Sequence, residues 1–132
     1  MTVNVSTPTR PEEKISKLLT LIGQPVRVQI LLVIGAGEAC VCHLEAVLGV
    51  RQASISQHLM VLREAGLVTT QREGRNIFYR LAQPEVIDLL HHAVGLAGGS
   101  PESLAGLTRR PVAGCPCPKC NPSQDPELSC SI

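Results

Sequence analysis

The chain has 132 residues and a formal net charge of +1, which fits one small domain with tails and argues against a general polyanion binder. Its composition is 44% hydrophobic with one Phe, one Tyr and no Trp, so the core must be aliphatic. No apolar run is long enough to span a bilayer, and the polar N-terminus lacks a signal-peptide core. We therefore expect a cytoplasmic protein without a membrane partner.

Residues 1–10 are mostly polar, and we expect them to form a mobile N-terminal arm. The segment 11–22 starts with Pro-Glu-Glu, which favours a helix start, and then carries an apolar stripe at helical spacing. The stripe consists of Ile15, Leu18, Leu19 and Ile22. A helix this apolar should pack on the core or on a partner chain. The segment 25–34 is almost continuously apolar and predicts a buried helix with only Arg27 and Gln29 facing solvent.

Two short helical patterns separated by a tight turn occupy residues 40–66. Their apolar positions are Leu44, Val47 and Leu48 in the first run, and Ile55, Leu59 and Leu62 in the second. Each run follows one face of a helix, and each ends at a glycine, Gly49 and Gly66. The polar residues of the second run fall largely off its apolar stripe. This pattern is typical of a helix-turn-helix, whose second helix enters the DNA major groove.

The rhythm changes after Gly66 to strand-like VTTQ, a turn at residues 72–75 and strand-like NIFYRL, which predicts a β-hairpin wing. A last helix starts at Gln83-Pro84-Glu85, runs to about Leu96 and is apolar on more than one stripe. Residues 98–132 hold six of the ten prolines and four of the six cysteines without periodicity, and predict a flexible tail. The predicted fold class is thus mainly α with a small β-hairpin wing, a winged helix-turn-helix domain within residues 11–97.

Six cysteines in a protein expected to be cytosolic favour metal or redox chemistry over disulfides. Cys40 and Cys42 form a Cys-x-Cys at the head of the first motif helix, where the helix N-terminus lowers thiol pKa values and favours the metal-binding thiolate. A lone cysteine is more often a small buried apolar residue. Because residues i and i+2 of a regular helix point about 200° apart, both sulfurs can reach one ion only if the first turn is irregular. Ion binding would then distort a helix that abuts the recognition helix.

The chain resembles the ArsR/SmtB family of winged-helix, metal-responsive repressors over roughly residues 14–97. The resemblance rests on IGQPVRVQILLVI, on CVCHLEAVLGVRQASISQHLMVLREAGLV and on the wing REGRNIFYRL. Gln24-Pro25-Val26-Arg27 stands where the family often has Asp-Pro-Thr-Arg, which weakens the local helix cap. The resemblance implies a two-fold dimer built from the first and last helices, and symmetric pairing is also the commonest oligomer. It further implies that Cys40 and Cys42 are ligands of a thiolate site similar to those of arsenite and cadmium/lead sensors.

Two sulfurs are too few for arsenite, Cd(II) or Pb(II), which take three or more thiolates. The eighteen residues from Ala97 to Cys115 let the tail reach either subunit's cysteine helix, at up to about 3.3 Å per residue. We expect one or more of the tail cysteines to complete the site, with Cys130 ranked below the others. The tail candidates are Cys115, Cys117 and Cys120. The competing interpretation is that the tail binds metal by itself or serves as an independent thiol reservoir.

The histidines are weaker candidates for metal binding. Asp88, His91 and His92 match only part of the family's other metal site, on the last helix, and are interpreted as interface or surface residues. His43 is ranked as a surface residue, and His58 is better explained as facing DNA.

DNA-reading residues are predicted on the second motif helix and on the wing. They are Arg51, Ser54, Ser56, Gln57, His58, Arg72 and Arg75. Gln57 can bond adenine with two hydrogen bonds, and the arginines can hold phosphates, which position the protein without reading sequence. Between Arg51 and Leu81 five arginines face two glutamates, and this local basic excess suits a DNA binder that doubles the patch by dimerising.

The leading interpretation is a homodimeric repressor that binds operator DNA and is released when thiolates bind arsenite, with Cd(II) or Pb(II) as alternative inducers. A second interpretation keeps the repressor but makes the signal thiol oxidation or persulfide formation. A third, an oxidoreductase using Cys117-Pro118-Lys119-Cys120, is disfavoured because a redox Cys-x-x-Cys usually sits at a strand–helix junction and not in a Pro-rich tail. We therefore expect no enzyme, and we infer no partner protein other than a second copy.

Overall fold

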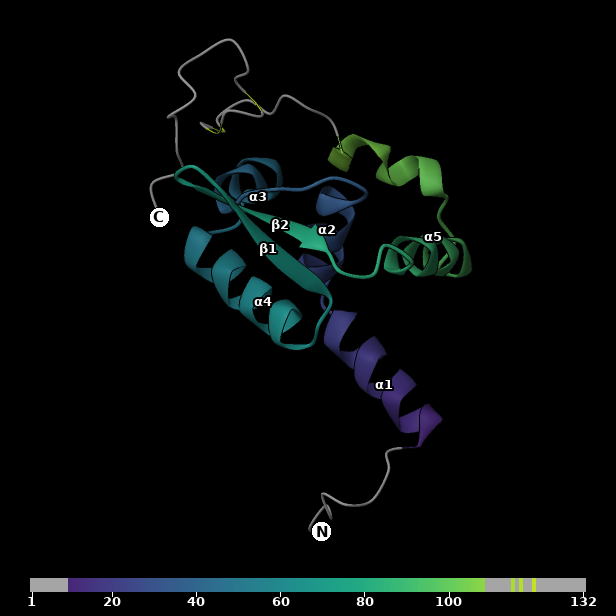
Figure 1. Cartoon of the computed structure of the whole chain (residues 1–132). Coiled ribbons are helices and arrows are strands. Elements are labelled where there is room, and N and C mark those ends of the chain that lie inside the picture. Colours follow the sequence, from purple (N-terminus) through teal and green to yellow (C-terminus); the bar gives the residue numbers. More distant parts are fainter. Residues whose placement is uncertain (1–9, 109–114, 116, 118–119, 121–132) are drawn as a thin grey trace.

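The structure, a computed structural model, describes residues 10–108, 115, 117 and 120. The elements in order are α1 (Pro11–Ile22), α2 (Pro25–Ile34), α3 (Val41–Leu48), α4 (Gln52–Glu64), β1 (Val68–Glu73), β2 (Asn76–Leu81), α5 (Val86–Leu96) and a 3₁₀ helix, η1 (Pro101–Thr108). Five helices and one antiparallel hairpin confirm the winged helix-turn-helix fold (Figure 1). Residues 1–9 of the predicted arm (residues 1–10) lie outside the described residues.

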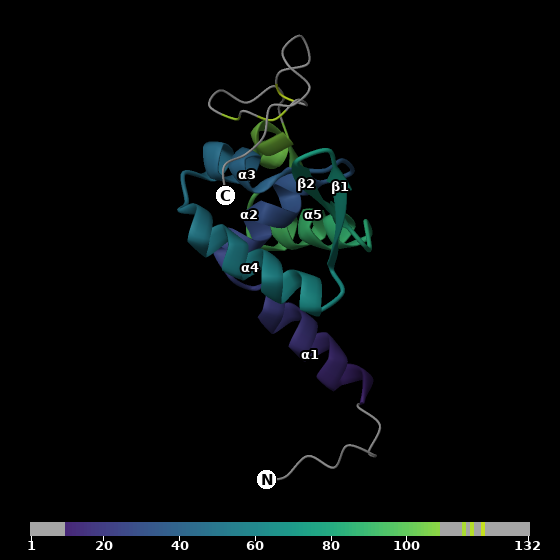
Figure 2. The same ribbon diagram turned by 60° about the vertical axis from the view of Figure 1, so that its left-hand side comes forward.

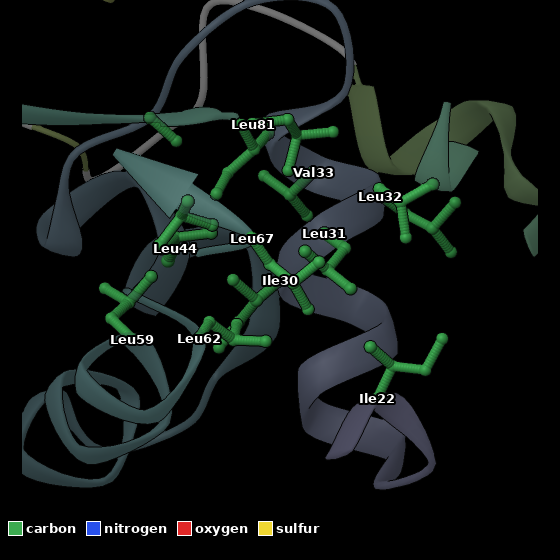
Figure 3. Packing of buried hydrophobic residues seen from close by; sticks show 14 of the residues in the cluster. Ile22, Ile30, Leu31, Leu32, Val33, Leu44, Leu59, Leu62, Leu67 and Leu81 are labelled. Atoms are coloured by element: carbon green, nitrogen blue, oxygen red, sulfur yellow. The ribbon is translucent and has the colours of Figure 1, made fainter. Parts of the chain in front are cut away.

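Helix α2 is the centre of the aliphatic core. Its residues 30–34 are all buried, as its continuous apolar run predicts. The inward stripes of the two motif helices reach it, with Leu44 from α3 and Leu59 and Leu62 from α4 (Figure 3). Leu67, which precedes β1, and Leu81, the last residue of β2, belong to the same cluster. The core therefore holds α3, α4 and the wing in one body around α2.

The wing is a two-stranded antiparallel hairpin with Glu73 paired to Asn76. Gly74 opens the two-residue turn at φ 62°, as type II′ hairpin turns require. A short bridge extends the hairpin, because the backbone N–H groups of Ala39 and Tyr79 each donate to the other residue's carbonyl, at 3.1 and 2.8 Å. The residue before Cys40 is thereby bonded to the wing.

Helix α1 projects away from the body of the molecule (Figures 1 and 2). Ile22 at its end is buried, but Ile15 and Leu19 are 58% and 48% exposed. Helix α5 also leaves apolar side chains exposed, at Leu89 and Leu96. The first helix was expected to pack on the core or on a partner chain. In the single chain it contacts the core at its C-terminal end, and the rest of its apolar stripe is exposed.

No single helix in the described part of the chain is long and apolar enough to cross a membrane, although α1 and α2, bent by 88° at their junction, meet that test of length and composition as a pair.

Residues 101–108 fall within the predicted flexible tail, yet they form η1, which packs on α2 and α5. Leu104 and Leu107 lie against the core cluster. Leu104 and Leu107 are three residues apart, which matches the repeat of a 3₁₀ helix. The 3.6-residue period of an α-helix therefore does not reveal η1 in the sequence. The domain boundary at residue 97 stays a prediction.

Candidate functional site

Cys40 precedes α3 and caps its N-terminus. Its backbone is extended, with φ −91° and ψ 168°, so it stands outside the regular helix. The Cys40 Sγ accepts a hydrogen bond from the backbone N–H of His43 at 3.4 Å, as N-cap side chains do. The side chain is only 1% exposed. Extended backbone is the ordinary conformation of an N-cap residue, so the irregular first turn that would bring Cys40 and Cys42 to one ion stays a prediction.

Three cysteines distant in the sequence, Cys115, Cys117 and Cys120, are buried in one cluster with Cys40. The Cys115 Sγ lies 4.0 Å from the Cys40 Sγ and 3.4 Å from the Cys117 Sγ. All three of these sulfurs lie within 4.8 Å of one another, close enough to hold one ion. We call Cys40, Cys115 and Cys117 the thiol triad. Phe78 of β2 packs on the same cluster, which brings the wing against it.

His43 is 1% exposed, so the prediction of a surface position is wrong. It lies on the inner face of α3, one residue before the buried Leu44. Its Nδ1 is 3.3 Å from the Cys120 Sγ. A ring nitrogen of His43 and the sulfurs of Cys115 and Cys120 again lie within 4.8 Å of one another. We call this second group the imidazole–thiol triad.

Cys42 packs half-buried against the cluster but belongs to neither triad. It is disulfide-bonded, whereas the four other cysteines that the structure describes are free. The Cys42 Sγ accepts a hydrogen bond from the Nε2 of Gln52, the first residue of α4, at 3.8 Å. The first turn of α3 thus contacts the head of the recognition helix. A ligand role for Cys42 stays a prediction, and Cys130 lies outside the described residues.

Burial raises the pKa of the Cys40 and Cys115 thiols. Desolvation is the largest cause in both, and at Cys40 it outweighs the hydrogen bond from the His43 N–H, which lowers the pKa. The expectation that the helix N-terminus favours the Cys40 thiolate is therefore wrong for this structure. An ion that binds these sulfurs must displace their protons.

The predicted DNA-reading residues occupy α4 and the tip of the wing. Arg51 caps α4 and is exposed, as is Gln57, whereas Ser54 and Ser56 are half-buried. Arg72 and Arg75 flank Gly74 and are exposed. Helix α4 and the hairpin lie side by side in both views of the molecule (Figures 1 and 2). The arrangement offers one polar helix face and two arginines at the wing, and their contacts with DNA stay predictions.

His58 contacts the protein as well. It is half-buried, and its Nδ1 accepts a hydrogen bond from the Arg27 Nε at 3.1 Å. The Arg27 Nη1 also donates to the carbonyl of Leu21 at 2.8 Å. Arg27, expected to face solvent, is therefore half-buried between α1 and α4. Burial, and then the charge of Arg27, lower the pKa of His58.

Comparison with known proteins identifies the family. The family model for "Bacterial regulatory protein, arsR family" matches residues 24–70. The chain is 43% identical over 77 residues to the Biofilm growth-associated repressor of Agrobacterium fabrum. This alignment covers 58% of this chain and 66% of that protein. It is 48% identical over 56 residues to the arsenic resistance transcriptional regulator ArsR1 of Pseudomonas putida, 42% of this chain and 43% of that protein.

A solved structure resembles the chain over a longer stretch. HlyU from Vibrio cholerae, also solved in a form described as reduced, superimposes with a TM-score of 0.59 at 34% identity, over 65% of this chain and 97% of that one. The chain belongs to the arsR family of bacterial regulatory proteins. The family model covers α2, α3, α4 and the first residues of β1, and the tail cysteines Cys115, Cys117 and Cys120 lie outside the matched residues 24–70.

At the cluster of this arsR-family regulator, His43 was assigned to the surface from the sequence, and Phe78 was not singled out. His43 had a detectable signal, because Cys40, His43, Leu44 and Val47 follow the i, i+3, i+4, i+7 pattern of one helix face. Phe78 had none, since its contact with cysteines beyond residue 114 depends on tertiary packing. Asp88, His91 and His92 are exposed on α5, in agreement with the interpretation that they are surface or interface residues.

Proposed function

We propose that this arsR-family protein is a homodimeric transcriptional repressor that leaves its operator when cysteine thiolates bind a thiophilic metal or metalloid, with arsenite as the first choice. Cd(II) and Pb(II) are the alternative inducers. The observation that carries the proposal is the thiol triad, in which three sulfurs from α3 and the tail converge in a buried position. Three thiolates in a pyramid suit arsenite, and soft ions in general select sulfur ligands.

The relatives support the regulatory part of the proposal. The Agrobacterium protein is named a repressor, and the Pseudomonas relative is named an arsenic resistance regulator. In this chain the exposed Arg51 and Gln57 of α4 and the wing arginines Arg72 and Arg75 would contact the operator. Phosphate contacts from the arginines would fix position, and Gln57 would read a base edge.

Two contacts can transmit ion binding to the DNA-binding elements. The first runs through Ala39, which is bonded to Tyr79 of the wing and is covalently joined to Cys40. The second is the hydrogen bond from Gln52 of α4 to Cys42. An ion that draws the triad sulfurs together would strain both contacts. Release follows if the ion binds the DNA-incompetent arrangement more tightly than the competent one.

The decisive experiment titrates the reduced full-length protein, bound to its own promoter DNA, with arsenite, Cd(II), Pb(II) and Zn(II), followed by fluorescence anisotropy. We expect near-stoichiometric arsenite to release the DNA. Cys117→Ser removes a member of the thiol triad and should block release, whereas Cys120→Ser lies outside that triad and is the matched control. Release by Cd(II) or Pb(II) alone would replace arsenite as the inducer. The metal proposal fails if none of the ions releases DNA.

A second candidate keeps the repressor but makes thiol oxidation the signal. Two observations favour it: Cys42 is disulfide-bonded, and the sulfurs of Cys115 and Cys117 are 3.4 Å apart. Two thiols at this distance can form a disulfide by giving two electrons and two protons to an oxidant. A peroxide or persulfide donor would then release the DNA in the absence of metal. The same anisotropy assay with oxidant in place of ions separates this candidate from the first.

A further inference from the structure

His43 occupies a position in α3 that the core would fill most simply with an apolar side chain. It lies beside Leu44, which is fully buried, and is itself 1% exposed. Burying an imidazole costs free energy unless its nitrogens have polar partners. The Nδ1 atom meets a thiol at 3.3 Å, that of Cys120. His43 therefore contributes a nitrogen donor to a cluster that is otherwise made of sulfur.

The donor set of the imidazole–thiol triad differs from that of the thiol triad. Arsenite binds three sulfurs and has no need of an imidazole, whereas zinc-class cations commonly take mixed cysteine and histidine ligands in tetrahedral geometry. With Zn–S near 2.3 Å and Zn–N near 2.0–2.1 Å, adjacent ligand atoms of a tetrahedral site lie about 3.5–3.8 Å apart. The distance of 3.3 Å between His43 and Cys120 is close to such an edge.

We propose that His43, Cys115 and Cys120 form a nitrogen–sulfur subsite for a four-coordinate divalent cation of the zinc class, adjoining the thiol triad. The fourth ligand is a sulfur of the thiol triad or a water molecule. This inference takes the thiolate cluster of the proposed function as given and adds a determinant of which ion it holds. His43 then distinguishes a tetrahedral cation, which uses the imidazole, from arsenite, which does not.

The two triads share Cys115, and this has a consequence for competition. An ion that takes Cys115 in one triad removes a ligand from the other. Arsenite and a zinc-class cation are therefore expected to displace each other instead of binding side by side. A divalent cation displaces thiol protons into solvent. Arsenite, as As(OH)3, forms three As–S bonds while its three hydroxyl groups leave as water with the three thiol protons, and neither event changes an oxidation state.

The test uses Co(II) as a spectroscopic substitute for Zn(II), with reduced full-length protein and no DNA. Wild-type protein should show the sulfur-to-cobalt charge-transfer and visible bands of a tetrahedral site, and these should disappear as arsenite is added. His43→Asn and Cys120→Ser should each weaken Co(II) binding at least about 10-fold, because even outer-shell partners of metal ligands commonly cost 10–100-fold. Arsenite affinity of both variants should fall far less than Co(II) affinity, because neither side chain belongs to the thiol triad.

X-ray absorption spectroscopy on the zinc-loaded protein detects a nitrogen ligand of the metal directly. Wild type should show nitrogen at about 2.0–2.1 Å together with sulfur at about 2.3 Å, and His43→Asn should lose a nitrogen. His92→Asn, at an exposed histidine of α5, is the control and should change neither measurement.

Unchanged Co(II) binding in His43→Asn, or a sulfur-only zinc spectrum in wild type, would overturn the inference. Equal loss of Co(II) and arsenite in both variants would also overturn it, since His43 would then serve only to hold the tail. Failure of the proposed function looks different: Co(II) still binds through His43, but no ion releases promoter DNA.

Discussion

At the scale of single residues, the bond between Arg27 and His58 has a consequence for stability at low pH. Arg27 joins the recognition helix α4 to the end of α1, through His58 on one side and the Leu21 carbonyl on the other. Burial and the neighbouring charge lower the pKa of His58 below its ordinary value of 6.5. A depressed pKa means that folding favours the neutral imidazole. The contribution is therefore present above about pH 6.5 and is lost as the pH falls through the lower pKa of the folded protein.

We predict that His58→Asn loses less stability than wild type between pH 7.5 and pH 5.5. The asparagine side chain offers an oxygen acceptor to the Arg27 Nε but does not titrate. The measurement is the urea midpoint at both pH values, at one protein concentration. His92→Asn removes an exposed histidine and should behave as wild type does. Equal pH sensitivity of wild type and His58→Asn would show that the protonation of His58 does not affect folding.

At the scale of elements, the joint of the helix-turn-helix depends on Gly49, whose φ of 67° caps α3 in the left-handed region. A Cβ placed there would meet nothing within 4 Å, so the cost of Gly49→Ala is backbone strain alone, about 1–2 kcal/mol. Gly95 in α5 also has open space around its Cβ position but has no positive φ. Gly95→Ala should therefore stabilise the protein by about 0.5–1 kcal/mol. Urea unfolding measures the free energy of unfolding, which should fall in Gly49→Ala and rise in Gly95→Ala. A change in the same direction in both variants would contradict the prediction.

The elements themselves were predictable because their signals are local. The predicted helix start at Pro25 and the hairpin turn at residues 72–75 correspond to the start of α2 and to the Gly74 turn. The contacts that build the candidate site were not predictable in this way. Cys40 and Cys115 meet across 75 residues, and no periodicity connects such positions. The chemistry of the tail cysteines marks them as candidate ligands, but only the packing shows that Cys115 and Cys117 meet Cys40.

At the scale of the whole molecule, four of the six large apolar side chains exposed among the described residues lie on α1 and α5, the two helices that the family resemblance assigns to dimerisation. The other two, Met60 and Ile77, lie on α4 and β2. Ile15 and Leu19 of α1 are 58% and 48% exposed, and Leu96 of α5 is 91% exposed. Large exposed apolar patches commonly mark association surfaces. A second copy of the chain would cover these side chains and would place two recognition helices in one complex, as a two-fold operator requires.

We predict that Leu19→Glu converts the proposed dimer into monomers. A charge on the apolar stripe of α1 would be buried twice in a two-fold interface, and burying a charge without a partner is strongly unfavourable. Thr20→Glu introduces the same charge at an exposed position off that stripe and is the matched control. Sedimentation equilibrium should give twice the 14.1 kDa chain mass for wild type and Thr20→Glu, and the chain mass for Leu19→Glu at micromolar concentration. Because each monomer would retain only one recognition helix, Leu19→Glu should also bind promoter DNA more weakly. A monomeric wild type would refute the dimer, and a dimeric Leu19→Glu would place the interface away from α1.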